Sequence, residues 1–210
     1  MRNIVSTCCL ALLAACATAP GHERATVATN EMTALHTEIA ALRQQLDVTV
    51  AGLDALPQSD PLEGFRKYSE NVAGTEQHFA RMKSQAQAMR ESTQTYLDAW
   101  GQEISGVTTP EIRRRSEDRR TQMARTFQGV TDGLLSVSQT CEGVLVQFKD
   151  LQKHLSFDLN PTGLTAAQDL ITKAKNDGKR AKVVLDELAK QLHEVSRAFA
   201  PATVGPPPAK

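Results

Sequence analysis

Histidine and cysteine are the residues of this 210-residue chain best suited to metal binding or catalysis, and neither occurs in a pattern typical of such a site. None of the five histidines follows a glutamate by three residues, the spacing with which helical bundles bind two iron ions. His193-Glu194 is not followed by the second histidine of the zinc-protease helix motif. The haem-attachment, phosphate-loop and Gly-x-Ser-x-Gly motifs are also absent. We therefore expect no enzyme, no metal and no cofactor.

Cys16 is the cysteine whose surroundings predict a specific modification. Arg2 supplies positive charge ahead of an apolar stretch that runs from residue 4 to residue 15 and ends in Leu13-Ala14-Ala15-Cys16. This order is that of a signal peptide, and the stretch is shorter than the ~20 residues that cross a bilayer as a helix. The last four residues resemble the lipobox of bacterial lipoproteins. The resemblance implies that residues 1–15 are cleaved off and that the Cys16 thiol carries a diacylglyceryl group.

The same resemblance implies a location for the mature chain. Two or three acyl chains anchor a protein stably, whereas one binds a membrane only marginally. Residue 17 is alanine, not the aspartate that retains many lipoproteins in the inner membrane. The resemblance thus implies anchoring in the bacterial cell envelope, on the periplasmic face of the outer membrane. The alternative is an ordinary secretory signal peptide with a cysteine near its cleavage site.

Cys141 is then the only free thiol of the mature chain, because Cys8 and Cys9 leave with the signal peptide. A single free thiol excludes an internal disulfide and leaves an intermolecular bridge or burial as a small apolar residue. Cys141 falls on an apolar helix stripe, so we expect it to be buried.

A basic cluster opens the third predicted helix and consists of Arg113, Arg114, Arg115, Arg119 and Arg120. Such a cluster can bind anionic lipid headgroups or an acidic partner. The alternative is a solvated helix face that neutralises itself, since three pairs of opposite charge lie four residues apart: Glu111 with Arg115, Arg113 with Glu117, and Arg114 with Asp118. Positive charges at a helix N-terminus are destabilising. Their presence there favours a functional role for the cluster. We expect Tyr96 and Trp100 nearby.

Four segments show apolar residues three and four positions apart, the period of one helix stripe. They span residues 32–56, 65–104, 112–155 and 164–199, and Thr109-Pro110-Glu111 is a typical helix start. Sustained 3-4 alternation is the signature of a coiled coil, and short connections predict antiparallel neighbours. We therefore expect an all-α fold, an elongated antiparallel helical bundle or coiled coil of four helices with a shorter first helix. An arrangement with that helix undocked fits the pattern too.

The segments outside the helices complete the predicted organisation. Residues 16–30 carry no apolar periodicity and are expected to be the lipidated cysteine and a flexible tether, followed by the helical region 31–200. Residues 201–210 are expected to be a disordered proline-rich tail, because proline cannot continue a helix. Lys and Arg equal Asp and Glu at 24 each, which gives no global attraction to nucleic acid, so we expect none as a partner.

Several of these features together resemble a family of bacterial coiled-coil lipoproteins known only as a domain of unknown function. They are the lipobox, the N-terminal helix, Tyr96-Leu97-Asp98-Ala99-Trp100 with Glu103, the arginine-rich helix start, and the later Phe148, Leu151, Leu155 and Leu159-Asn160. The break at Asn160-Pro161 and the proline-rich tail depart from the family's pattern. No activity is established for that family, so the resemblance implies architecture and location only.

Two functions fit these observations. The first is a structural or adaptor element of the envelope that binds another envelope protein, or a second copy of itself, through its helix faces. The second is a lipid- or ligand-binding helical bundle that uses the end carrying Tyr96, Trp100 and the arginine cluster.

Overall fold

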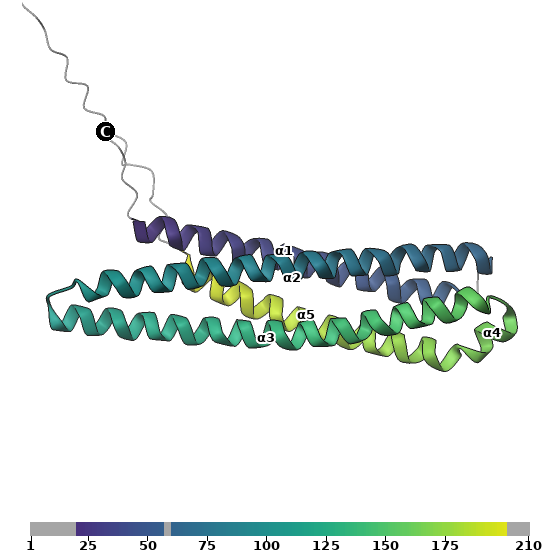
Figure 1. Ribbon diagram of the computed structural model, residues 1–210. Coiled ribbons are helices and arrows are strands. Elements are labelled where there is room, and N and C mark those ends of the chain that lie inside the picture. The colour runs from purple at the N-terminus through teal and green to yellow at the C-terminus, as the bar shows by residue number, and fades with distance from the viewer. Residues whose placement is uncertain (1–19, 57–59, 201–210) are drawn as a thin grey trace, which may run out of the picture.

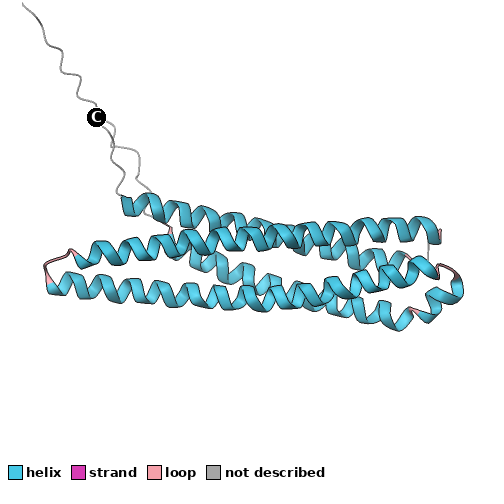
Figure 2. Cartoon of the chain, in the orientation of Figure 1, coloured by secondary structure: helices cyan, strands magenta, loops and turns pink. Residues whose placement is uncertain are grey.

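The computed structural model describes residues 20–56 and 60–200, and in these ranges the chain is all-α, as predicted (Figure 1). Its helices are α1 (Pro20–Ala55), α2 (Pro61–Ser105), α3 (Pro110–Phe157), α4 (Pro161–Ala166) and α5 (Gln168–Phe199). Helices joined by short loops make up nearly all of this part of the chain (Figure 2). The predicted signal peptide 1–15, the lipidated Cys16 and the tail 201–210 lie outside the described residues.

The beginning of α1 corrects one prediction. Helix α1 starts at Pro20, so most of the segment predicted as a flexible tether is helical. Ala25 and Ala28 are buried and extend the stripe of Met32 and Leu35 toward the N-terminus with small side chains. Alanine has the highest helix propensity, which explains why a segment without large apolar residues is helical. With 36 residues α1 is shorter than α2 and α3, as predicted, but it is longer than α5 with 32 and so is not the shortest of the long helices.

The predicted fourth helix is divided in two. The side chain of Asn160 accepts a hydrogen bond from the Gly163 amide at 2.9 Å and caps the six-residue α4. Gly163 packs so closely that a Cβ atom there would lie 2.1 Å from the carbonyl oxygen of Asp158. A turn at Ala167 then leads into α5. Helix α4 therefore redirects the chain from the end of α3 onto the face where α5 packs.

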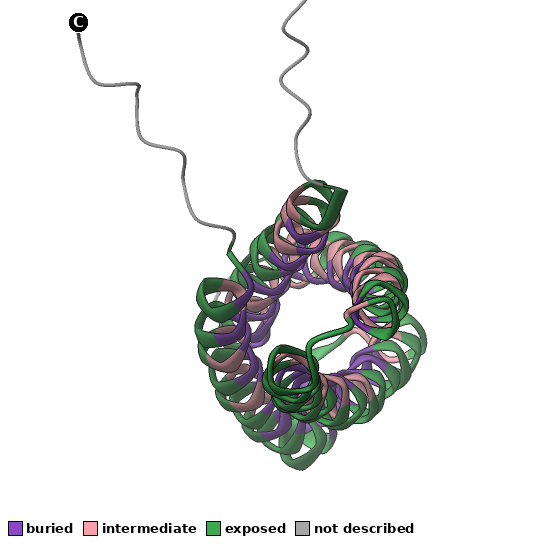
Figure 3. Cartoon of the chain, turned by 90° about the vertical axis from the view of Figure 1, so that its left-hand side faces the viewer, coloured by how far each residue is buried: buried purple, intermediate pink, exposed green. Residues whose placement is uncertain are grey.

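The four long helices lie side by side, each in contact with two others. Helix α1 packs against α2 and α5, and α3 packs against the same two helices. Viewed from the end, the buried residues face inward and the exposed residues face outward (Figure 3). The 3-4 stripes predicted from the sequence are buried along most of their length, from Leu35 and Leu42 in α1 to Leu188 and Leu192 in α5. The predicted third stripe is the exception at its start, because α3 has no buried residue before Met123.

Polar contacts also join the helices through the core. The Tyr68 hydroxyl donates to the carbonyl oxygen of Phe148 at 2.9 Å and thereby ties α2 to α3. The Thr49 and Thr75 hydroxyls lie 2.8 Å apart and link α1 to α2. Cys141 is buried, as predicted, and its burial raises the pKa of the thiol to about 12.

Helices α1 and α5 approach each other closely at Gly178. A Cβ atom at this position would lie 2.6 Å from Val50 Cγ2 and 3.4 Å from Phe148 Cζ. A larger residue here would overlap a stiff β-branched side chain.

Candidate functional site at the α2–α3 hairpin

The hairpin of α2 and α3 extends further at its closed end than α1 and α5 do (Figure 1). None of residues 105–122 is buried, and the apolar core on α3 begins only at Met123. We call residues 101–120 the hairpin tip. Ile112 lies in this tip with 58% of its surface exposed. The arginine cluster therefore lies on a projecting pair of helices and not along the side of the molecule.

Hydrogen bonds join α2 to α3 near Trp100, where the hairpin tip begins. The Trp100 indole nitrogen donates to Ser116 Oγ at 3.0 Å, and the Arg120 Nε donates to the carbonyl oxygen of Leu97 at 2.8 Å. A Cβ atom at Gly101 would lie 3.1 Å from the Arg120 guanidinium, so the glycine leaves room for that side chain. Arg120 thus links α3 to α2 through its hydrogen bond.

Aromatic side chains join the base of the tip to the end of α5. The ring centroids of Tyr96 and Trp100 lie 5.7 Å apart, and those of Tyr96 and Phe199 lie 5.9 Å apart. Burial raises the pKa of the Tyr96 phenol, and the positive charge of Arg119 partly opposes this shift. The sequence-based expectation that Tyr96 and Trp100 lie close to the arginine cluster is therefore correct.

The arginines of the tip neutralise themselves less than their spacing predicts. Arg115 forms the expected ion pair with Glu111 at 2.7 Å. Arg113 instead donates from Nε and Nη2 to the carbonyl oxygen of Val107, at 2.9 and 2.6 Å. Within the described hairpin, the expected ion pairs of Arg113 with Glu117 and of Arg114 with Asp118 do not form.

The charge at the outermost turn is consequently positive. Arg113 binds a carbonyl group, which holds the side chain at the loop without cancelling its charge. Arg114 is exposed, and the described hairpin offers it no ion pair. Two acids of the hairpin are engaged with other cations, Glu111 with Arg115 and Glu103 with Arg24 at 3.9 Å. Glu117 and Asp118 lie about one turn further from the end.

An open groove lies where the start of α1 meets the base of the tip. It has a volume of about 320 Å³ and is lined by Pro20, Gly21, Arg24, Tyr96, Ala99, Trp100 and Glu103. One wall is aromatic, and the ion pair of Arg24 with Glu103 lies across it. Cys16, which lies outside the described residues, precedes Pro20 by four positions. The groove therefore marks the place where the chain enters its first helix.

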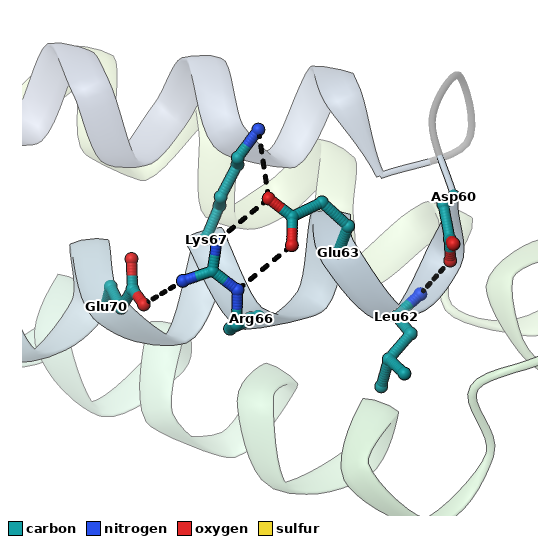
Figure 4. Close-up of polar contacts among 6 residues, drawn as sticks. All are labelled: Asp60, Leu62, Glu63, Arg66, Lys67 and Glu70. Carbon is teal, nitrogen blue, oxygen red and sulfur yellow. Dashed lines mark hydrogen bonds and ion pairs between the residues drawn. The ribbon is translucent and has the colours of Figure 1, made fainter.

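The opposite end of the molecule has a different surface. At the start of α2 the Asp60 side chain accepts from the Leu62 amide at 2.9 Å, and Glu63 binds both Arg66 and Lys67 (Figure 4). Hydrogen bonds from Arg66 and then from Lys67 lower the pKa of Glu63 to about 2. At the same end the side chain of Phe157 is exposed over 85% of its surface and that of Leu62 over 69%.

A ladder of polar pairs between α1 and α5 is a feature that the sequence analysis missed. The pairs are Asp54 with Lys175, Asp47 with Lys182, Arg43 with Asp186, and His36 with His193. Successive pairs are seven, four and seven residues apart, counted forward on α5 and back on α1. Charges at this spacing beside an apolar stripe are the available signal in the sequence, but they do not identify the partner helix.

Neither a metal site nor a membrane span occurs in the part of the chain that the structure describes. Within residues 20–56 and 60–200, no three histidine, cysteine, aspartate or glutamate side chains are grouped to hold a metal ion. In the same ranges no helix combines the length and apolar character needed to cross a bilayer. Comparison with known proteins found no matching family model and no curated relative.

Proposed function

We propose that the chain is a lipoprotein of the bacterial envelope, anchored through Cys16 on the periplasmic face of the outer membrane, and that it serves as a non-catalytic structural or adaptor element. The observation that carries this proposal is the position of Pro20. Four residues after Cys16, it lines the groove at one end of the long helices. An anchor there would leave the entire length of the helices free to extend away from the membrane.

The dimensions of the helices support a spacer or adaptor role. Helix α2 has 45 residues and is therefore about 68 Å long at 1.5 Å per residue. A protein held at the Pro20 end would present Phe157 and Leu62 far from the lipid. Leu135 and Val146 on α3 and Val183 on α5 are also exposed by half or more of their surface. These apolar side chains are the positions at which we expect an envelope protein, or a second copy of this chain, to dock.

The proposal includes packing of the coiled-coil type in an antiparallel four-helix bundle. It is supported by the inward-facing 3-4 stripes and by the steps of seven, four and seven residues in the ladder between α1 and α5. It also includes the resemblance to the family of bacterial coiled-coil lipoproteins described above. The resemblance implies an architecture and a location for the chain but no enzymatic activity.

Lipid attachment is tested by metabolic labelling with a radioactive fatty acid. We expect label in the wild-type chain and none in the Cys16→Ser variant, which should also lose cleavage after residue 15. An unlabelled wild-type chain would contradict the anchor.

Adaptor function is tested by photo-crosslinking in living cells. A photoreactive residue is placed at Leu135, Val146 or Phe157, and at exposed polar positions such as Gln139 for comparison. We expect the apolar positions to give one discrete adduct, to a single envelope protein or to a second copy of the chain. Absence of adducts at every apolar position would overturn the adaptor role.

A ligand-binding bundle is the second candidate function, and the groove between α1 and α2 is the observation that favours it. Tyr96 and Trp100 offer apolar ring surface there, and Arg24 offers a charge. Native mass spectrometry of the purified chain distinguishes the two functions. A stoichiometric bound lipid would favour the second, and a chain without additional mass would favour the first.

A further inference from the structure

Pro20, which follows Cys16 by four positions, lies at the same end of the molecule as the hairpin tip. Trp100 and Pro20 line the same groove, so the start of α1 is level with Trp100. From Trp100 the hairpin continues for about seven residues to its loop, or about 10 Å at the helical rise. The four residues from Cys16 to Pro20 span at most about 14 Å. At full extension, four residues are therefore long enough to match the projection of the tip.

The outermost turn of the tip has the chemistry of a surface that binds anionic headgroups. Arg113 and Arg114 have no carboxylate partner there, and the bonds to the Val107 carbonyl hold the Arg113 guanidinium at the loop. Planar guanidinium groups match the geometry of phosphate. Ile112 is 58% exposed beside them and can enter the interfacial region. Trp100 and Tyr96 lie just behind, as aromatic residues do at membrane surfaces.

The same positions are otherwise unfavourable for the fold. Three arginines in the first turns of α3 lie near the positive end of the helix dipole. Only Arg115 is compensated by an ion pair, with Glu111. A negatively charged surface opposite the tip would offset this repulsion.

We propose that the hairpin tip rests on the bilayer in which the chain is anchored and binds anionic phospholipid headgroups through Arg113, Arg114 and Arg115. The inference rests on the proposed lipid anchor at Cys16. Its consequence is orientation, because two contacts at one end would hold the long helices upright instead of letting them swing about a single tether.

The experiment uses the full lipid-carrying protein purified from membranes and reconstituted into vesicles. One set of vesicles contains phosphatidylcholine alone and the other contains phosphatidylglycerol as well. A polarity-sensitive fluorophore is attached at Thr108→Cys in the loop of the tip, or at Ser156→Cys at the far end. Cys141 is buried and its thiol has a pKa raised to about 12, so labelling is confined to the added cysteine.

We expect a blue-shifted signal at position 108 with the anionic vesicles only, and its loss at high salt. The signal at position 156 should be the same with both vesicles. The R113Q/R114Q/R115Q variant should lose the shift at position 108. Each basic residue near an anionic surface contributes about fivefold in affinity, so the variant should need at least tenfold more anionic lipid to recover the signal.

Two variants separate binding from folding. K153Q/K179Q/K190Q removes the same charge from exposed positions outside the tip and should behave as wild type. R114Q/R119Q removes two exposed tip arginines that hold no hydrogen bond or ion pair in the described hairpin, so it should weaken the response while leaving the helical circular dichroism signal unchanged.

The possible failures are distinguishable. If the protein floats with both kinds of vesicle but the signal at position 108 is the same in both, the tip does not bind anionic lipid and the inference is wrong. If it floats with neither, Cys16 carries no anchor, and the proposed function and this inference are both overturned. Equal responses at positions 108 and 156 would show that the chain lies flat and would contradict the upright orientation.

Discussion

Substitution of Gly178 by alanine tests the close approach of α1 and α5. In an exposed helix position, replacing glycine with alanine stabilises by about 1 kcal/mol. At Gly178 the new Cβ would lie 2.6 Å from Val50 Cγ2, and Val50 is itself buried. Overpacking of this kind costs about 1–3 kcal/mol. The free energy of unfolding of Gly178→Ala should therefore equal that of the wild type or be lower by up to about 2 kcal/mol.

Gly143 on α3 provides the matched control. A Cβ atom there would meet no heavy atom within 4 Å, so Gly143→Ala should raise the free energy of unfolding by about 1 kcal/mol. The two variants should differ by about 1–3 kcal/mol, which urea denaturation monitored by circular dichroism resolves if the slope of the transition is the same. Val50→Ala removes the methyl group that is overlapped. Combined with Gly178→Ala it should be less destabilising than the sum of the two single changes.

A Gly178→Ala variant as stabilised as Gly143→Ala would refute this reasoning, because Cβ atoms at both positions would then be equally unobstructed. Strict additivity with Val50→Ala would refute it as well. Either result would mean that α1 and α5 do not pack in the register described here.

Three further outcomes are expected. Tyr68→Phe removes the hydrogen bond to the Phe148 carbonyl and should lower the free energy of unfolding by about 1 kcal/mol in the same denaturation assay, with no change if that bond does not form. The pKa of Asp177 is below its usual value, first because Lys173 donates to it, so this carboxylate stabilises the fold above the unfolded pKa of about 4 and loses that effect as the pH falls through the lower folded pKa. Asp177→Asn should therefore flatten the fall in melting temperature below about pH 4, and parallel curves for the two proteins would contradict this role. Cys141 should react with a thiol reagent only when the protein unfolds, because the thiol is buried and its pKa is raised to about 12; labelling as fast as in denaturant would contradict its burial.

Helix boundaries followed closely from the sequence where large apolar residues and prolines mark them. The predicted third segment 112–155 corresponds to α3 at Pro110–Phe157, and the second segment 65–104 to α2 at Pro61–Ser105. The start of α1 was missed because alanines continue its stripe. The helix start at Thr109-Pro110 was correct, but Thr109 makes no capping hydrogen bond with its side chain. Residue preferences predict where a helix begins. Whether the capping side chain forms its hydrogen bond depends on its rotamer, which the surrounding loop determines.

The candidate site was predictable in composition but not in its contacts. The proximity of Trp100 to the arginine cluster follows from folding α2 back onto α3, and it is correct. Spacing alone predicted three ion pairs in the cluster, and one forms. Arg113 turns instead to the Val107 carbonyl, because the loop brings an unpaired backbone acceptor within its reach. An i,i+4 rule cannot take account of that competing acceptor.

The periodicity of the apolar residues by itself determined that this protein is all-α and which face of each helix is buried, because a stripe at 3-4 spacing has one solution in helical geometry. Only the tertiary structure decided that α1 packs against α5, where Gly178 meets Val50, and that Asp54 lies opposite Lys175. These pairings depend on contacts between residues more than a hundred positions apart. Because several helices carry similar apolar stripes, the sequence pattern does not determine which residues face one another. Packing and charge between the helices set that register.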